Sequence, residues 1–370
     1  MEKKDKTLVI LTPAFPGNES ETYWVPSQQL LVKALHNNFP GVKIIVLSLQ
    51  YPDHRSSYTW HGITVFSFDG MHRRKLKRLS LWQNIRHTVK DIHSTHTIIG
   101  LFSCWCGECA LIGKYLARKY TLRHYIWICG QDARKTNRWI SFIRPRGDEL
   151  VAMSPSLVRE FQKNHGKKPL HIIPNAIDRE SFSLPVTAHR DIDIFAAGSF
   201  EPLKQFDLYT RIVHSIRQSL PDIKASHCGI GREKKKIESL VKELELEDHL
   251  QLLGGKPHAE LLQLMQRTRV FLHTSRYEGF STVCLEALYA GAHVISFCYP
   301  LDHNVPHWHV VNSPEEMKAK AIEILQDPRT SHTPVMLYDM DESAKAVMGL
   351  YISNSGPKSK AVITETIRIS

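Results

Sequence analysis

Two carboxylates stand eight residues apart in the segment Arg276-Tyr-Glu278-Gly-Phe-Ser-Thr-Val-Cys-Leu-Glu286. Glu286 is the only charged residue between Thr282 and Phe297, in a stretch typical of a buried helix. A buried carboxylate without a partner is strongly unfavourable, so Glu286 must have a hydrogen-bonding partner. Sugar hydroxyl groups are suitable donors, and we predict that Glu286 binds them.

Glu278 precedes the helix that we expect over residues 281–290, a poor place for core packing and a good one for contacting a ligand. Gly279 leaves the backbone open there. The N–H groups of Phe280, Ser281 and Thr282, together with the helix dipole, form an anion site that suits a diphosphate. The alternative for Glu278 is a solvated loop carboxylate. Gly291 stands where a left-handed helix cap is expected.

Short apolar strands alternate with amphipathic helices along the chain, which predicts the α/β class with mainly parallel sheets. The pattern restarts after Pro185. We therefore expect two Rossmann-like doubly wound domains that face each other across a cleft, with sites beyond the carboxyl ends of the strands. The predicted ranges are 1–185 for the first domain, 186–352 for the second and 353–370 for a C-terminal tail.

The charge of the chain is uneven. The net formal charge of +11 divides into +14 over residues 1–190 and −3 over residues 191–370. An anionic partner is thus expected for the first half. No apolar run is long enough to cross a bilayer and no leader opens the chain, so a cytoplasmic location is predicted.

Seven cysteines in 370 residues do not suggest a secreted disulfide framework. Cys104, Cys106 and Cys109 are close in sequence, but they lack the second pair of ligands that a zinc site needs. We interpret them as buried thiols and predict no metal site.

The Glu278/Glu286 spacing resembles the E-x7-E motif of retaining family-4-type glycosyltransferases, also called glycosyltransferase group 1. Three further segments are similar to that family: Cys228-Gly-Ile-Gly231, Leu250-Gln-Leu-Leu-Gly-Gly255 and Ile173-Pro-Asn-Ala-Ile-Asp178. The likeness is specific over residues 173–300 and more diffuse before them. It implies the GT-B fold, with a nucleotide-sugar bound between the two domains.

The resemblance also implies roles for single residues. Glu286 would bind the ribose hydroxyls of the nucleotide, and Glu278 would lie beside the donor sugar. Lys204 would neutralise the charge that develops on the leaving diphosphate, although a solvated surface lysine is the alternative. The loop around Gly17 would face the same phosphates from the first domain. The family usually needs no metal or other cofactor.

Two departures from the family pattern stand out. Ser199 replaces an arginine that often follows the glycine after the first strand of the second domain, and Arg276 or Lys256 could replace that phosphate contact. Cys129 replaces a histidine near the junction of acceptor and donor. Asp132 and Arg134 could supply polar groups there, or the acceptor geometry could differ, or activity could be weak or absent.

The segment from Met71 to Trp82 is basic and amphipathic, as in helices that lie on anionic membranes. The alternatives are an ordinary helix with a solvated basic face and an apolar face on the core, or, less favoured, a nucleic-acid surface. Its predicted membrane residues are Arg73, Arg74, Lys75, Lys77, Arg78 and Trp82.

We therefore expect a retaining, metal-independent hexosyltransferase that moves a sugar from a nucleoside diphosphate to a hydroxyl of a glycan or lipid-linked acceptor. Surface polysaccharide assembly on the inner face of the cell membrane is the expected setting, with no nucleic-acid partner. The alternatives are a non-catalytic nucleotide-binding homologue and a GT-B nucleotide-sugar epimerase.

Overall fold

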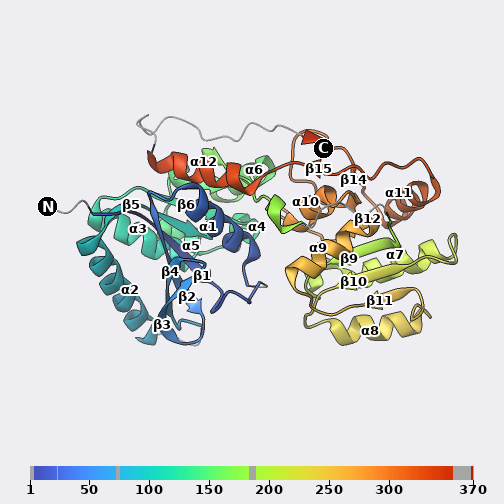
Figure 1. The fold of residues 1–370 in the computed structure, drawn as a ribbon, viewed down its shortest axis with the longest axis horizontal. Coiled ribbons are helices and arrows are strands. Elements are labelled where there is room, and N and C mark those ends of the chain that lie inside the picture. The colour runs from blue at the N-terminus through green and yellow to red at the C-terminus, as the bar shows by residue number, and fades with distance from the viewer. Residues whose placement is uncertain (1–3, 23, 72–75, 183–188, 353–367, 370) are drawn as a thin grey trace. The chain divides into compact units, whose positions relative to one another are not determined.

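The computed structural model describes residues 4–22, 24–71, 76–182, 189–352 and 368–369. Its contacts divide the chain into two compact α/β units (Figure 1). The first unit holds the described residues up to Asn175 together with Met340–Ile352. The second holds the described residues from Ala176 to Asp339, together with 368–369.

The first unit is built on an eight-stranded sheet in the order β3-β4-β2-β1-β5-β6-β7-β8. All its pairs are parallel except the edge pair β3–β4, an antiparallel hairpin that the sequence analysis did not predict. The strand order reverses between β1 and β5, which places a switch point at their carboxyl ends. The strands are β1 (Lys6–Ala14), β2 (Lys43–Tyr51), β3 (Arg55–Trp60), β4 (Ile63–Phe68), β5 (Thr97–Cys104), β6 (His124–Ile128), β7 (Leu150–Ala152) and β8 (His171–Ile172).

Helices cover both faces of this sheet (Figure 1). One apolar core joins Val9 and Leu47 of the sheet to Ile85 and Leu116 of two helices, which fits the apolar spacing of those helices. The helices are α1 (Pro26–Asn38), α2 (Leu76–Thr95), α3 (Glu108–Tyr120), α4 (Gly130–Ala133), α5 (Trp139–Ile143), α6 (Pro155–His165) and α12 (Met340–Ile352), with a 3₁₀ turn η1 (Gly147–Glu149).

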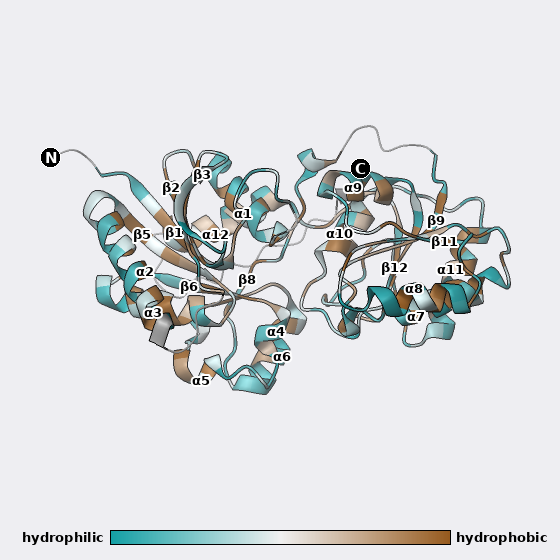
Figure 2. Cartoon of the chain, turned by 90° about the horizontal axis from the view of Figure 1, so that it is seen from below, coloured by the Kyte–Doolittle hydropathy of each residue, from teal (hydrophilic) through white to brown (hydrophobic). Residues whose placement is uncertain are grey.

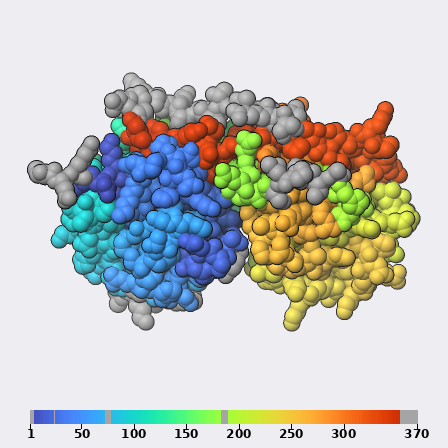
Figure 3. Space-filling view, viewed as in Figure 1, coloured from blue at the N-terminus to red at the C-terminus, as the bar shows by residue number. Residues whose placement is uncertain are grey.

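Helix α12 corrects the predicted domain ranges, which assigned it to the second domain. Its red surface lies against the blue N-terminal half in Figure 3, and it packs beside α1. Tyr351 donates to the carbonyl oxygen of Leu101 (2.7 Å). Gly100 leaves the space for that ring, because a Cβ there would lie 2.2 Å from it. The predicted boundary at 185/186 lies outside the described residues, as does most of the predicted tail.

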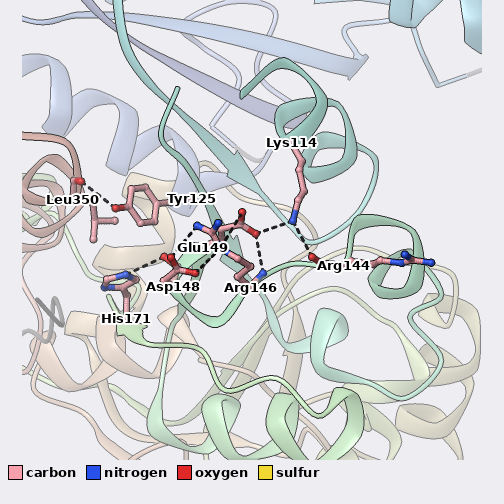
Figure 4. Close-up of polar contacts among 8 residues, drawn as sticks. All are labelled: Lys114, Tyr125, Arg144, Arg146, Asp148, Glu149, His171 and Leu350. Carbon is pink, nitrogen blue, oxygen red and sulfur yellow. Dashed lines mark hydrogen bonds and ion pairs between the residues drawn. The ribbon is translucent and has the colours of Figure 1, made fainter. Parts of the chain in front are cut away.

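A buried lysine fixes the segment between α5 and β7 (Figure 4). Lys114 of α3 donates to the carbonyl oxygen of Arg144 (2.8 Å) and to Glu149 Oε2 (2.9 Å). Because this pair is almost fully buried, removing one partner would leave an uncompensated charge. The end of α5 is therefore tied to α3.

The second unit holds a six-stranded parallel sheet in the order β11-β10-β9-β12-β13-β14. This is the Rossmann order, which reverses between β9 and β12. Phe271 of β12 is in register with Phe195 of β9. The strands are β9 (Ile192–Ala197), β10 (Ala225–Cys228), β11 (Leu250–Leu252), β12 (Thr268–His273), β13 (His293–Ser296) and β14 (Trp308–Val310), and a separate antiparallel pair joins β15 (Val335–Met336) to β16 (Arg368–Ile369).

The second core packs Ile194 and Val270 of the sheet against Val213 and Met317 of the covering helices. The helices are α7 (Phe206–Arg217), α8 (Lys234–Glu243), α9 (His258–Gln266), α10 (Thr282–Tyr289) and α11 (Pro314–Gln326), with the 3₁₀ turns η2 (Arg179–Ser181) and η3 (Pro202–Lys204). Two Rossmann-like units confirm the predicted fold class. Among the described helices, none has both the length and the apolar character needed to cross a bilayer.

Candidate functional site

The carboxyl ends of β9 and β12 bring Lys204 and Glu278 together, although 74 residues separate them in sequence. The order of the second sheet reverses between these two strands, and ligands of doubly wound folds bind at such a point. Lys204 ends the short turn after β9, and Glu278 stands in the loop after β12. The sheet topology therefore creates the candidate site.

The loop after β12 holds Lys204 in place. The Thr274 hydroxyl donates to the carbonyl oxygen of Lys204 (2.8 Å). The backbone N–H of Arg276 donates to the carbonyl oxygen of Leu203 (3.0 Å). These bonds join the two loops, so the ammonium group is presented from a fixed backbone.

Glu278 accepts a hydrogen bond from the Lys204 ammonium group, and its Oε1 lies 3.4 Å from Nε2 of His273. Burial raises the pKa of Glu278, but the hydrogen bond from His273 and the charge of Lys204 outweigh it and lower the pKa to about 2. Glu278 is thus an ionised member of a polar network. This excludes the alternative of a freely solvated loop carboxylate.

His273 is the centre of this network and was not identified from the sequence. The residue is buried at the end of β12, with Nε2 3.2 Å from the Ser281 hydroxyl and 3.3 Å from that of Ser275. Its Nδ1 is buried and has no hydrogen-bond partner among the described residues. In the sequence, the only sign of this role is that His273 ends an apolar strand shortly before the Glu278/Glu286 motif.

Two glycines let the β9 and β10 loops approach each other. A Cβ at Gly229 would lie 1.9 Å from the carbonyl oxygen of Gly198, and one at Gly231 would lie 2.6 Å from the Phe200 nitrogen. Both glycines have φ near +158°, which other residues rarely adopt. The Cys228-Gly-Ile-Gly231 segment therefore serves backbone packing beside the site.

Helix α10 begins at the site without a side-chain cap. Ser281 occupies the N-cap position, but its side chain accepts no hydrogen bond from the first turn. Phe280 is buried against Tyr338, with ring centroids 5.6 Å apart, which anchors the loop that contains Gly279. The anion site predicted at residues Phe280, Ser281 and Thr282 stays a prediction, based on the general attraction of helix N-termini for anions. Gly291, at φ +82°, follows the helix as predicted.

Glu286 has a partner within the protein. The side chain is buried, with the residue 6% exposed, and its Oε1 lies 2.8 Å from Nε2 of His258 at the start of α9. Burial works to lower the pKa of His258, but the hydrogen bond to Glu286 and the charge of Glu286 outweigh it and raise that pKa. His258 therefore meets the need for a partner that the sequence analysis assigned to ligand hydroxyls. The bond engages one of the two carboxylate oxygens.

The other predicted phosphate contacts are not part of this network. Ser199 and Arg276 are exposed side chains near it, and Lys256 pairs with Glu260 at 3.2 Å. Gly17 belongs to the first unit, and its N–H donates to Glu21 Oε2 (3.0 Å). The N–H group that we expected to face phosphates therefore donates to a carboxylate of the same loop.

On the acceptor side, the structure gives Asp132 a structural role. Its Oδ2 accepts from the backbone N–H of Cys129 (2.8 Å), which caps α4. Burial raises the pKa of Asp132 to about 7, against the lowering effect of the N–H groups of Cys129 and Cys106. Cys129 is partly exposed at the end of β6, and Arg134 is half-buried just after α4.

The three clustered cysteines are buried thiols, as predicted. Burial raises the pKa of each of them, so the thiolate form is disfavoured. Within the described ranges, no group of three or more His, Cys, Asp or Glu side chains could hold a metal ion.

The basic segment from Met71 to Trp82, which continues into α2, is described only in part. Arg73, Arg74 and Lys75 lie outside the described residues, and only the backbone of Lys77 is described. Arg78 forms an ion pair with the buried Glu108, and the Trp82 Nε1 donates to Glu108 Oε1 (2.8 Å) while its ring packs on the core. The contacts of Arg78 and Trp82 therefore support the alternative prediction, an ordinary helix whose apolar face packs on the core.

The two Rossmann-like units have the GT-B fold. Residues 179–336, less than half of the chain, match the family of glycosyl transferases group 1. The predicted resemblance is thereby confirmed. Among solved structures, Anabaena Alr3699/HepE in complex with UDP and glucose has the same fold, with a TM-score of 0.64 at 14% identity over 94% of this chain and 95% of that one.

The curated relatives match this chain over only part of their own length. The gpi3 subunit of phosphatidylinositol N-acetylglucosaminyltransferase from Schizosaccharomyces pombe is 24% identical over 272 residues, which are 69% of this chain and 59% of that subunit. The N-acetylgalactosamine-N,N'-diacetylbacillosaminyl-diphospho-undecaprenol 4-alpha-N-acetylgalactosaminyltransferase of Campylobacter jejuni is 29% identical over 163 residues, which are 42% of this chain and 43% of that protein. The matches thus span about half of these relatives' own length.

Proposed function

We propose that this protein is a retaining glycosyltransferase that moves a hexose-type unit from a nucleoside-diphosphate sugar to a hydroxyl group of a glycan or a lipid-linked acceptor. The observation that carries the proposal is the network of Lys204, His273 and Glu278 at the switch point of the second sheet. It lies beside the uncapped start of α10, the helix that contains Glu286.

Donor binding follows from the charges at this site. The ribose hydroxyls of the nucleotide would bind the carboxylate of Glu286, which His258 orients through one oxygen. The diphosphate would bind at the first turn of α10 and at Lys204. An ammonium group has three donors, so Lys204 can bind a phosphate oxygen while it stays paired with Glu278.

In the transfer step, the bond between the anomeric carbon and the leaving phosphate oxygen breaks. The acceptor oxygen forms its bond to that carbon on the same face, and its proton passes to the leaving phosphate. This route retains the anomeric configuration and requires no protein base. Lys204 and the helix dipole would stabilise the charge on the leaving group, so we propose transfer without a metal ion.

The acceptor class is inferred from the relatives. Their names refer to a phosphatidylinositol acceptor and to a diphospho-undecaprenol acceptor, both lipid-linked. We propose a similar acceptor here, used in surface polysaccharide assembly at the cytoplasmic face of a membrane. Arg73, Arg74 and Lys75 of the basic segment would contact that membrane. Flotation of the Arg73→Glu, Arg74→Glu, Lys75→Glu variant with anionic vesicles tests this contact, and undiminished binding would contradict it.

A donor screen by mass spectrometry tests the enzymatic proposal. Purified protein is incubated with common UDP- and GDP-sugars, with and without EDTA, in the presence of lipid-linked acceptors. Release of nucleoside diphosphate together with a glycosylated product supports transfer, and NMR of the product shows whether the anomeric configuration is retained. Conversion of the free donor to its epimer would instead identify an epimerase.

The second candidate is a non-catalytic homologue that binds nucleotides. The observations that favour it are Ser199, an exposed side chain where the family often has an arginine, and Cys129 in place of the family histidine. Binding of UDP or GDP without turnover of any donor would establish this role.

A further inference from the structure

His273 is the most deeply buried member of the polar network in the second unit. The side chains of Lys204, Glu278 and His273 are 26%, 17% and 5% exposed, in that order. Figure 2 shows β12, which His273 ends, and the neighbouring β9 mainly in the brown of hydrophobic residues. A bound ligand would therefore contact Lys204 and Glu278, whereas His273 acts on it only through Glu278.

The contacts of His273 Nε2 fix where the ring carries its proton. This nitrogen lies 3.4 Å from Glu278 Oε1, 3.2 Å from Ser281 Oγ and 3.3 Å from Ser275 Oγ. An unprotonated Nε2 would face the ionised carboxylate as a second acceptor, so this nitrogen carries the proton and donates. Burial raises the pKa of Glu278, and the hydrogen bond from His273 is the largest of the effects that lower it.

The other ring nitrogen indicates that packing alone does not explain His273. Nδ1 is buried and has no hydrogen-bond partner among the described residues. An unpaired buried polar atom lowers the free energy of unfolding, and an apolar side chain would avoid this cost at the end of an apolar strand. The histidine is therefore explained by the contacts of its Nε2 and not by the stability of the strand.

The backbone of the loop between β12 and α10 is held by contacts that do not involve the histidine ring. On the side of β9, the Arg276 N–H donates to the carbonyl oxygen of Leu203 (3.0 Å). On the side of β13, the Cys298 thiol donates to the carbonyl oxygen of Ser275 (3.2 Å). Loss of the histidine ring should therefore release the Glu278 side chain while the loop stays in place.

We propose that His273 is a positioning residue that holds the Glu278 carboxylate toward a hydroxyl group of the donor sugar. The inference rests on the proposed function, in which Glu278 lies beside that sugar. Lys204 and His273 both contact Oε1 of Glu278, so Oε2 is the atom that we assign to the sugar hydroxyl. A carboxylate that is oriented before the donor arrives loses less conformational entropy on binding.

Isothermal titration calorimetry of the full chain with two kinds of probe tests this role. UDP and GDP report on the nucleotide alone, whereas UDP-glucose, UDP-N-acetylglucosamine and GDP-mannose also report on the sugar. His273→Leu should bind UDP and GDP as wild type does. It should bind the nucleotide-sugar that wild type prefers roughly tenfold more weakly, because a hydrogen bond to a charged group is lost.

Two amide variants make the test specific for one ring nitrogen. His273→Gln keeps an N–H near the position of Nε2 and should restore most of the affinity for the nucleotide-sugar. His273→Asn places its N–H near the position of Nδ1 and should not restore it. Circular dichroism checks folding, and His273→Asn takes the place of His273→Leu if the leucine variant does not fold.

A double-mutant cycle shows whether His273 acts through Glu278. Glu278→Gln should weaken binding of the nucleotide-sugar, and the addition of His273→Leu should cause no further loss. His249→Leu serves as the matched control, because it removes a histidine that contacts a backbone carbonyl oxygen at the opposite edge of the same sheet. This variant should bind every probe as wild type does.

The possible results separate the role of His273 from the proposed function. An equal loss of affinity for UDP and GDP in His273→Leu, no recovery in His273→Gln, or additive losses in the double variant would overturn the role of His273. Normal binding of the nucleotide-sugar by His273→Leu would refute that role alone. Wild-type protein that binds UDP or GDP but none of the nucleotide-sugars would refute the proposed function and this role together.

Discussion

His258 Nε2 lies 2.8 Å from Glu286 Oε1, and this buried pair joins the first turn of α9 to the middle of α10. It explains how a carboxylate is tolerated in an apolar helix before any ligand binds. One oxygen is used by the histidine, so a ribose contact would have to use the other oxygen or share the first. Because Glu286 already has a partner in the protein, a ligand-binding role has to be tested separately from its structural role.

Replacing Glu286 with Ala should weaken UDP or GDP binding by about 1–3 kcal/mol, the usual cost of leaving buried donors without their acceptor. Isothermal titration calorimetry measures the change, and circular dichroism checks folding. Glu260→Ala removes an exposed carboxylate from the neighbouring helix and should leave affinity unchanged. Unaltered affinity in a folded Glu286→Ala protein would show that the pair is only structural.

The His258–Glu286 pair should make stability fall as the pH rises above about 6.5. The pKa of His258 is raised in the folded state, so its contribution is fully present below the unfolded value of about 6.5. That contribution is lost as the pH rises through the folded pKa. Urea unfolding from pH 6 to 9 should show this loss in wild type and not in His258→Gln, which keeps a hydrogen bond without titrating. If wild type and His258→Gln lost stability equally between pH 6 and 9, the pH dependence could not be assigned to His258.

Replacing Lys204 with Met should lower the rate of sugar transfer by roughly 10²–10³-fold, the typical effect of removing one group that stabilises developing negative charge. Because the pKa of Glu278 is lowered to about 2, Glu278 keeps its negative charge at pH 5.5 and at pH 8. The defect should therefore be similar at both pH values. Lys242→Met on α8 serves as the control, and an equal loss there, or a defect confined to one pH, would count against this role.

A histidine cluster (His293, His307, His309 and His332) should make the second unit sensitive to acid. Nδ1 of His293 lies 3.1 Å from Nε2 of His309, and the rings of His293 and His307 stack with centroids 4.3 Å apart. Burial is the largest cause that lowers all four pKa values, to about 3 for His293 and about 4 for His332. Arg190, Arg269 and Lys320 add to this effect, while Glu323 opposes it at His309.

The unfolded chain binds protons below a pH of about 6.5, whereas the folded histidine cluster does not until the pH is much lower. Stability should therefore fall as the pH drops from 6.5 toward 4. His332→Asn should make this fall shallower in thermal unfolding measurements. His54→Asn, at an exposed position of the first unit, is the control. An unchanged acid profile in His332→Asn would refute the contribution of the cluster.

Much of the fold could be predicted because buried parallel strands and their covering helices have distinct apolar spacings. The helix expected over residues 281–290 spans Thr282–Tyr289 in the structure. The β3–β4 hairpin was missed because its half-exposed strand lacks a continuous apolar run. Helix α12 was placed in the wrong unit because apolar spacing shows that a helix is buried, not against which sheet.

The sequence by itself determined the Rossmann-like pattern, the Glu278/Glu286 motif and the position of the helix that contains Glu286, since these depend on local spacing and backbone preference. Only the tertiary structure decided that His258 is the hydrogen-bonding partner of Glu286. It also decided that His273 lies in the polar network of Lys204 and Glu278, and that the Gly17 N–H donates to Glu21. The His258–Glu286 and Lys204–Glu278 contacts link residues 28 and 74 positions apart in sequence. They follow from strand order and loop packing, which no local pattern encodes.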